Sequence, residues 1–132
     1  MDDGVRGRKL RLLVVDDHPA ALGGLRLRLS REPDLAIVGE ATAAEEAVRL
    51  AIQLQPDVVL ADLALPDGDG IDLIGRLHEL APGLRSVILT LDDSPEQRRR
   101  AFRTGAMGFV GKHESTDVLL AAIRGWSVPR RG

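Results

Sequence analysis

The stretch LRLLVVDD (residues 10–17) decides the fold, because an apolar run of strand length ends there in two acidic residues. Four more runs of this kind follow, and after each of the five comes a turn and then a segment whose apolar residues have helical spacing. Three of the runs are apolar without alternation, which is typical of strands covered on both faces. The five runs are Leu10–Val15, Leu35–Ala41, Val58–Ala61, Ser86–Thr90 and Gly108–Val110.

This alternation predicts one α/β domain, a doubly wound parallel sheet with helices on both sides and right-handed crossovers. Five strands suit the flavodoxin-like (βα)5 topology, with strand order 2-1-3-4-5. A chain of 132 residues has room for one such domain, which we expect to span residues 10–126. Residues 1–9 are expected to be a disordered leader. Residues 127–132 are expected to be a frayed tail or the start of a linker to an output domain absent from the chain.

The helical segments carry their own start and stop signals. Thr42 and Glu45 have the spacing of a capping box at the second helix, and Ser94 and Gln97 repeat it at the fourth. Gly105 is expected to end the fourth helix in a left-handed conformation. The residues expected to face the sheet are Leu22, Leu25, Leu29, Ala44, Ala47, Val48, Ala51, Ile52, Leu73, Ile74, Leu77, Leu80, Leu119, Ala122, Ile123 and Trp126.

Chemically useful side chains follow the strands at the edge where this topology binds ligands. Ligands bind outside the carboxyl ends of strands one and three, where the strand order reverses. Asp16 and Asp17 come directly after the first strand, and Asp62 after the third. Thr90 ends the fourth strand, and Lys112 follows the fifth. We therefore expect three carboxylates, a hydroxyl and an ammonium to converge.

Three neighbouring carboxylates repel one another unless a cation lies between them. Mg²⁺ (or Mn²⁺) suits this set, because it takes oxygen ligands and binds a few carboxylates together with phosphate oxygens. Asp62 is then a natural nucleophile toward phosphorus. Lys112 can neutralise charge on the phosphoryl oxygens, and the Thr90 hydroxyl can donate to one of them. The alternative is that these five side chains are ordinary polar loop residues, since the ends of strands meet water.

Composition excludes several other classes of function. The chain has no cysteine, so disulfides, thiolate zinc sites and thiol catalysis are excluded. A net charge of −2 and only three aromatic residues give no support for a nucleic-acid site. No apolar run is long enough to span a membrane, and we expect a cytoplasmic protein. The segment Asp67-Gly-Asp-Gly begins like a calcium loop but lacks the later ligands, so we interpret it as a turn.

Longer stretches resemble the response-regulator receiver domain of two-component signalling, and its NarL/FixJ-like subgroup in particular. They are VVDDHP (14–19), REPDLAIVGEA (31–41), QPDVVLADLALPDGDGIDLI (55–74) and GAMGFVGK (105–112). The resemblance implies that Asp62 is the phosphoacceptor and that Asp16 and Asp17 bind the metal with Asp62 and the backbone carbonyl of Ala64. It further implies that Lys112 binds phosphate, that Thr90 is the switch hydroxyl and that Phe109 is the switch aromatic, which turns inward when Thr90 moves. A permanently buried Phe109 is the alternative.

The resemblance also implies partners. A sensor histidine kinase would supply the phosphoryl group, and a homodimer is compatible with the subgroup. DNA would be bound only through an output domain not present in this chain, and no membrane contact is expected. The protein is then a phosphoacceptor switch of a transcription regulator and not an enzyme with turnover. The alternatives are a stand-alone or atypical receiver that acts by docking, with weak or no phosphorylation, and an aspartate-dependent hydrolase, against which Ala64 argues because it offers no acid or base.

Some residues depart from the family pattern. Gly111 stands where a large aliphatic residue is expected before Lys112, at a cost of about 1 kcal/mol of strand stability. Leu91 follows Thr90 where the family often has a small residue, and we hypothesise that it slows donor access to Asp62. The arginines of the fourth helix are interpreted as a solvated face, with contact to an acidic partner surface or to an output domain as the alternative; they are Arg98, Arg99, Arg100 and Arg103.

Overall fold

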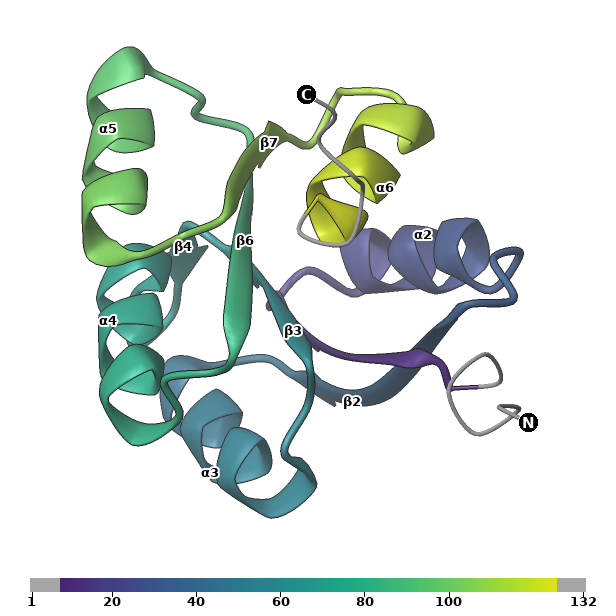
Figure 1. Cartoon of the computed structure of the whole chain (residues 1–132). Helices are drawn as coiled ribbons and strands as arrows, with labels where there is room; N and C mark the ends of the chain where they lie inside the picture. Colours follow the sequence, from purple (N-terminus) through teal and green to yellow (C-terminus); the bar gives the residue numbers. More distant parts are fainter. Residues whose placement is uncertain (1–7, 126–132) are drawn as a thin grey trace, which may run out of the picture.

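The computed structural model describes residues 8–125, and it shows one parallel sheet with helices on both faces (Figure 1). The sheet has five strands in the order β2-β1-β3-β6-β7, which is the predicted order 2-1-3-4-5. The strands are β1 (Leu10–Val15), β2 (Leu35–Ala41), β3 (Val58–Asp62), β6 (Arg85–Thr90) and β7 (Gly108–Gly111). The flavodoxin-like fold is therefore confirmed, whereas most of the expected leader and tail, and Trp126, lie outside the described residues.

Each face of the sheet has its own apolar core. The helices α2 and α6 cover one face, and α3, α4 and α5 cover the other. Neighbouring residues of a strand alternate between the two cores, so that Val14 packs with α2 and Val15 with α3. The helices are α2 (Pro19–Leu29), α3 (Ala44–Leu54), α4 (Gly70–Leu80), α5 (Pro95–Thr104) and α6 (Thr116–Arg124).

Two residues expected to face the sheet do not. Ile52 and Leu80 are 61% and 55% exposed. Each lies in the last turn of its helix, and the two line a surface hollow of about 320 Å³ between the ends of α3 and α4. The apolar stripe therefore ends one turn earlier than its spacing predicted.

The capping box predicted at Thr42 and Glu45 is also wrong. The N-cap residue of α3 is Ala43, which makes no side-chain cap. The first N–H groups of α3, those of Ala44 and Glu45, donate instead to the carboxylate of Asp67, at 2.6 and 3.1 Å. Asp67 lies in the turn between two short antiparallel strands that the sequence did not predict, β4 (Ala64–Leu65) and β5 (Gly68–Asp69).

The start and end of α5 agree better with their sequence signals. The Ser94 hydroxyl accepts a hydrogen bond from the Gln97 N–H at 3.3 Å, which is the first half of the predicted capping box, while the Gln97 side chain accepts a hydrogen bond from Arg100. Gly105 ends the helix with φ of +120°, a conformation that favours glycine. The Ser94 cap therefore fixes the start of α5 directly after the loop that follows β6.

Candidate functional site

The carboxyl ends of four parallel strands bring the predicted site residues together. Asp16 follows β1, Asp62 ends β3, Thr90 ends β6 and Lys112 follows β7. The strands pair in register close to these ends, with Asp62 opposite Leu89 and Thr90 opposite Gly111. All four of these side chains consequently lie at one edge of the sheet.

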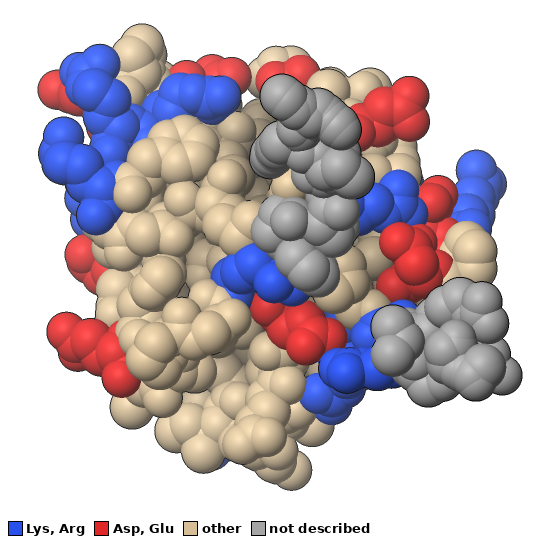
Figure 2. All heavy atoms as spheres, viewed as in Figure 1, with Lys and Arg blue, Asp and Glu red and all other residues tan. Residues whose placement is uncertain are grey.

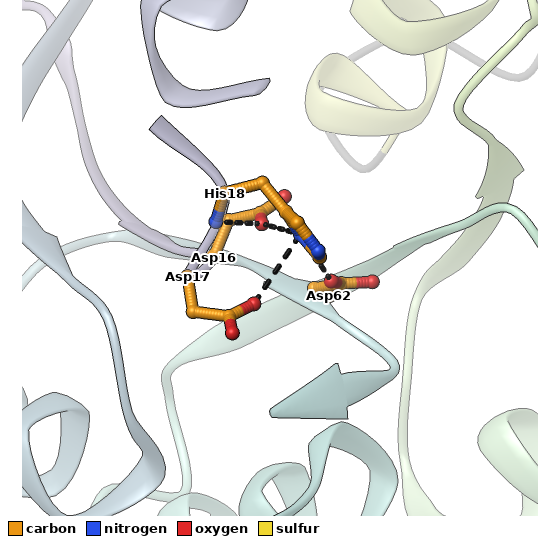
Figure 3. Close-up of side chains that lie close together, drawn as sticks. All are labelled: Asp16, Asp17, His18 and Asp62. Carbon is orange, nitrogen blue, oxygen red and sulfur yellow. Dashed lines mark hydrogen bonds and ion pairs between the residues drawn. The ribbon is translucent and has the colours of Figure 1, made fainter. Parts of the chain in front are cut away.

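The side chains of Lys112 and His18 lie among the three carboxylates. The Lys112 Nζ is 2.7 Å from Asp16 Oδ2 and 3.3 Å from Asp62 Oδ2. On the other side, the His18 Nδ1 is 2.9 Å from Asp16 Oδ1, 3.3 Å from Asp17 Oδ1 and 3.8 Å from Asp62 Oδ2 (Figure 3). One possible ligand atom from each of Asp16, Asp17, His18 and Asp62 falls within 4.8 Å of the others. The acidic side chains at this edge of the sheet therefore form one compact cluster.

The two buried acids differ in their protonation. Burial raises the pKa of Asp16, but hydrogen bonds from Lys112 and His18 more than offset it, so that the pKa lies below its ordinary value. Burial also dominates for Asp62, whose pKa is raised, because Lys112 offsets only part of the effect and the charge of Asp16 adds to it. Asp16 is thus held as an anion, while Asp62 is the more basic carboxylate.

Asp62, Thr90 and Lys112 line one open hollow of about 460 Å³, together with Ala64 and Leu91. A hydrogen bond with the Ala64 backbone lowers the pKa of Asp62 slightly against the stronger effect of burial. The exposed Leu91 side chain, at 77%, stands at this hollow as the sequence hypothesis requires. The hollow is therefore an opening to solvent beside the largely buried Asp62 carboxylate.

The Thr90 hydroxyl is occupied elsewhere. It accepts a hydrogen bond from the Asp92 N–H at 2.8 Å and donates to the Asp92 carbonyl at 3.2 Å. Thr90 itself is 2% exposed. Its side chain is thus held by the loop between β6 and α5, and not by Asp62.

Phe109 has the buried position that its alternative interpretation gave it, and Gly111 has a close neighbour. Phe109 is 4% exposed and belongs to the core under α3, α4 and α5, so it already lies inward. The space beside Gly111 is filled, because a Cβ there would come within 2.7 Å of the His113 ring. A larger residue at 111 would have to displace His113.

Sequence reasoning missed His18 and Gly70. His18 stood in the quoted VVDDHP motif, directly after the acidic pair and at the N-cap of α2, yet no role was given to it. Gly70 opens α4 against the backbone of Asp62, where any side chain would collide with the Asp62 carbonyl. Its only sequence signal was a glycine at the start of a predicted helix.

Comparison with known proteins gives the same reading as this geometry. A model of the response regulator receiver domain matches residues 12–124, which is most of the chain. The chain belongs to the response regulator receiver domain family. This family is the phosphorylation switch of two-component systems, and its members generally bind Mg²⁺ at an acidic pocket like the one formed here.

Relatives of this receiver domain are transcription regulators. It is 32% identical over 114 residues to the transcriptional regulatory protein UhpA of Salmonella typhimurium, which covers 86% of the chain and 57% of UhpA. It is 40% identical over 115 residues to the DNA-binding transcriptional activator DevR/DosR of Mycobacterium tuberculosis, covering 87% of the chain and 53% of the relative. NarL of Escherichia coli is 33% identical, covering 85% of the chain and 52% of NarL, so the NarL-like resemblance is confirmed. The receiver chain spans about half the length of these relatives.

Solved structures of response regulators have the same fold. A LuxR-family two-component response regulator from Aurantimonas sp. SI85-9A1 has a TM-score of 0.87 at 35% identity, covering 93% of this chain and 88% of that one. The signal receiver domain of the putative response regulator NarL from Mycobacterium tuberculosis has a TM-score of 0.86 at 28% identity, covering 93% of this chain and 99% of that one.

Among the helices of residues 8–125, none combines the length and the apolar character that a membrane span requires.

Proposed function

We propose that Asp62 accepts a phosphoryl group from a phosphohistidine on a sensor histidine kinase. A carboxylate oxygen of Asp62 attacks phosphorus, the phosphorus–nitrogen bond breaks, and the released imidazole of the kinase takes up a proton. The observation that supports this best is the position of Asp62. It is buried at the end of β3, with Lys112 Nζ at 3.3 Å, and it lines a hollow open to solvent.

The donor set fits a divalent metal ion. Asp16, Asp17 and Asp62 supply carboxylate oxygens within 4.8 Å of one another, which is the chemistry that Mg²⁺ or Mn²⁺ prefers. The Lys112 ammonium, which lies 2.7 Å from Asp16, supports the fit because it is a positive charge held by the same carboxylates. We propose these three acids and the carbonyl of Ala64 as the ligands. When bound, the ion neutralises charge on the phosphoryl oxygens.

The remaining roles concern the response to phosphorylation. We propose that Lys112 turns from the Asp62 carboxylate to a phosphoryl oxygen, with which it can make a charge-assisted hydrogen bond. Thr90 would exchange its two hydrogen bonds with Asp92 for one to the phosphoryl group, and so pull on the loop that leads into α5. We keep Phe109 as the proposed switch aromatic. Because its ring is already buried, we propose that phosphorylation changes which residues of the α5–β7–α6 face the ring contacts, and not its burial.

The relatives suggest the output. We propose that the domain is part of a cytoplasmic, DNA-binding transcription regulator, and that DNA is contacted through an output domain rather than through this chain. Formation of a homodimer is part of the same proposal. The domain is a switch that is phosphorylated and returns by hydrolysis of the aspartyl phosphate, and not an enzyme with a separate substrate.

Intact mass spectrometry after incubation with Mg²⁺ and acetyl phosphate tests the chemistry. We expect one added phosphoryl group on the wild type, none on Asp62→Ala, and an unchanged adduct on the control Asp72→Ala, an exposed aspartate of α4. A wild-type protein that gains no phosphoryl group, or an adduct that persists in Asp62→Ala, contradicts the proposal.

A further inference from the structure

A cavity of about 260 Å³ lies between α2 and α6, over the carboxyl ends of β6 and β7. Four of the side chains that line it are buried and apolar, namely Leu25, Leu89, Val110 and Leu119. Asp16 and Lys112, which form an ion pair, also line it, so the cavity borders the acidic cluster on the side of the α2–α6 core. An apolar lining with a few polar groups is typical of small-molecule sites.

The part of α2 that lines the cavity is built from very small residues. They are Ala20, Ala21 and Gly24. A Cβ added to Gly24 would meet no atom within 4 Å outside the backbone of its own helix, and its φ is not one that requires glycine. A glycine inside a helix is less favourable than an alanine there. The chain therefore keeps this space open at a cost to α2, although no neighbouring group fills it.

Arg28 is the charged residue at this cavity that has no acidic partner. Its Nε donates a hydrogen bond to the Thr116 hydroxyl at 3.0 Å, and so reaches from α2 to the first residue of α6. Among residues 8–125 it forms no ion pair, whereas Arg26 of the same helix is paired with Glu40 at 2.6 Å. The other N–H groups of the Arg28 guanidinium can therefore donate to a bound anion.

The lining determines the chemistry of a ligand. Asp16 and Lys112 already neutralise each other at 2.7 Å, so the unmatched charge at the cavity is the guanidinium of Arg28. A carboxylate matches a guanidinium both in charge and in geometry. The buried aliphatic side chains require the rest of the ligand to be apolar, and the volume limits it to a small molecule.

Charge alone does not direct an anion to this cavity. Figure 2 shows basic side chains gathered at the upper left of the molecule, over α5, where four of the ten residues are arginines. Toward the right, where Figure 1 shows α2, blue and red side chains are intermixed. A simple anion is therefore attracted mainly to α5, and only a ligand with an apolar body gains from entering the cavity.

We propose that the cavity between α2 and α6 binds a small apolar carboxylic acid as its anion. The carboxylate lies on Arg28, and the apolar body packs on Leu25, Val110 and the open side of Gly24. This is a ligand site separate from Asp62, and its occupation does not require phosphorylation.

Titration of the full chain with phenylpropionate, followed by NMR of the backbone amides, tests the proposal. Two control ligands separate its elements, since phenylpropanol lacks the carboxylate and propionate lacks the ring. We expect the acid to shift the amide signals of Gly24, Val110 and Leu119, and to bind about tenfold more tightly than either control. Arg28→Met should remove the advantage of the acid over the alcohol, whereas Arg31→Met, at an exposed arginine outside the cavity, should keep it.

A cavity-filling variant keeps the test independent of folding. Gly24→Leu puts a side chain where the structure has room and removes a glycine from a helix, so it should raise the melting temperature while weakening acid binding about tenfold or more. Gly23→Leu makes the same change at the neighbouring glycine, which does not line the cavity, and should bind the acid like the wild type.

Three results of the titrations overturn the proposal. They are equal binding of the acid and the alcohol, signal changes confined to α5, and full binding by Gly24→Leu. Self-association of the wild type that Gly24→Leu abolishes also overturns it, because the cavity would then belong to an interface between two copies of the chain.

Discussion

Replacing Lys112 with methionine removes one positive charge from the acidic cluster while keeping much of the side-chain volume. In the folded chain the ammonium is 2.7 Å from Asp16 Oδ2 and 3.3 Å from Asp62 Oδ2, and the lysine side chain is only 16% exposed. At an effective dielectric constant of about 20, these contacts correspond to roughly 6 and roughly 5 kcal/mol of Coulomb energy. The desolvation of the ammonium offsets most of that sum.

The net cost follows from what the substitution leaves behind. The carboxylates of Asp16 and Asp62 are 2% and 6% exposed and lose their closest cation. Removing one partner of a buried ion pair costs about 3–5 kcal/mol, and the hydrogen bond from the His18 backbone N–H to Asp16 still offsets part of it. We therefore expect Lys112→Met to lower the free energy of unfolding by about 3 kcal/mol at neutral pH without added metal.

Urea unfolding followed by circular dichroism measures this, with Lys9→Met as the control at an exposed lysine. The loss should shrink with added Mg²⁺ and should be smaller when Lys112→Met is made in the Asp62→Asn background, where Asp16 is the one carboxylate that loses the contact with Lys112. It should also shrink in acid. The folded pKa of Asp62 is raised by burial, so its ionisation destabilises the fold above that pKa and protonation removes the penalty as the pH falls through it. A Lys112→Met protein as stable as the wild type at neutral pH, or one whose loss is unchanged by Asp62→Asn, refutes the reasoning.

Three further predictions concern single contacts. His18→Ala removes the ring that lies 2.9 Å from Asp16, so Mg²⁺ binding measured by calorimetry should tighten about tenfold; unchanged or weaker binding means that His18 does not compete with the metal. Ser86→Ala removes a fully buried hydroxyl that has no partner among the described residues, and should raise the free energy of unfolding by about 1 kcal/mol in urea titrations; a loss of stability contradicts this. Asp67→Asn weakens the cap on Ala44. The backbone hydrogen bonds to the Asp67 carboxylate lower its pKa, so the ionised cap stabilises the fold above the ordinary pKa of 3.8. This stabilisation is lost as the pH falls through the lowered pKa. Melting temperatures of Asp67→Asn and wild type should therefore differ at neutral pH and converge in acid, and a difference that persists in acid would exclude the cap as its cause.

The alternation of apolar runs and helical segments was enough to predict the fold and the convergence of the site. Strand-length runs such as LRLLVV can be stable only when covered on both faces, which requires helices on both sides of a parallel sheet. In a parallel sheet the carboxyl ends of all strands lie at the same edge, so the residue after each strand lies at that edge. Asp16, Asp62 and Lys112 could therefore be brought together without coordinates, although they are far apart in the chain.

The tertiary structure alone decided how those groups are arranged. His18 lies between the carboxylates, Thr90 bonds to Asp92, and Asp67 caps a helix whose own Thr42 was expected to do so. These contacts depend on how loops approach one another, which follows no period in the sequence. The core stripes were likewise predicted correctly up to the last turn of α3 and α4, where the exposure of Ile52 and Leu80 depends on what covers the helix end. Hydrophobic periodicity fixes which way a helix faces because it is a local property, whereas loop contacts and the limits of the core are set by residues distant in sequence.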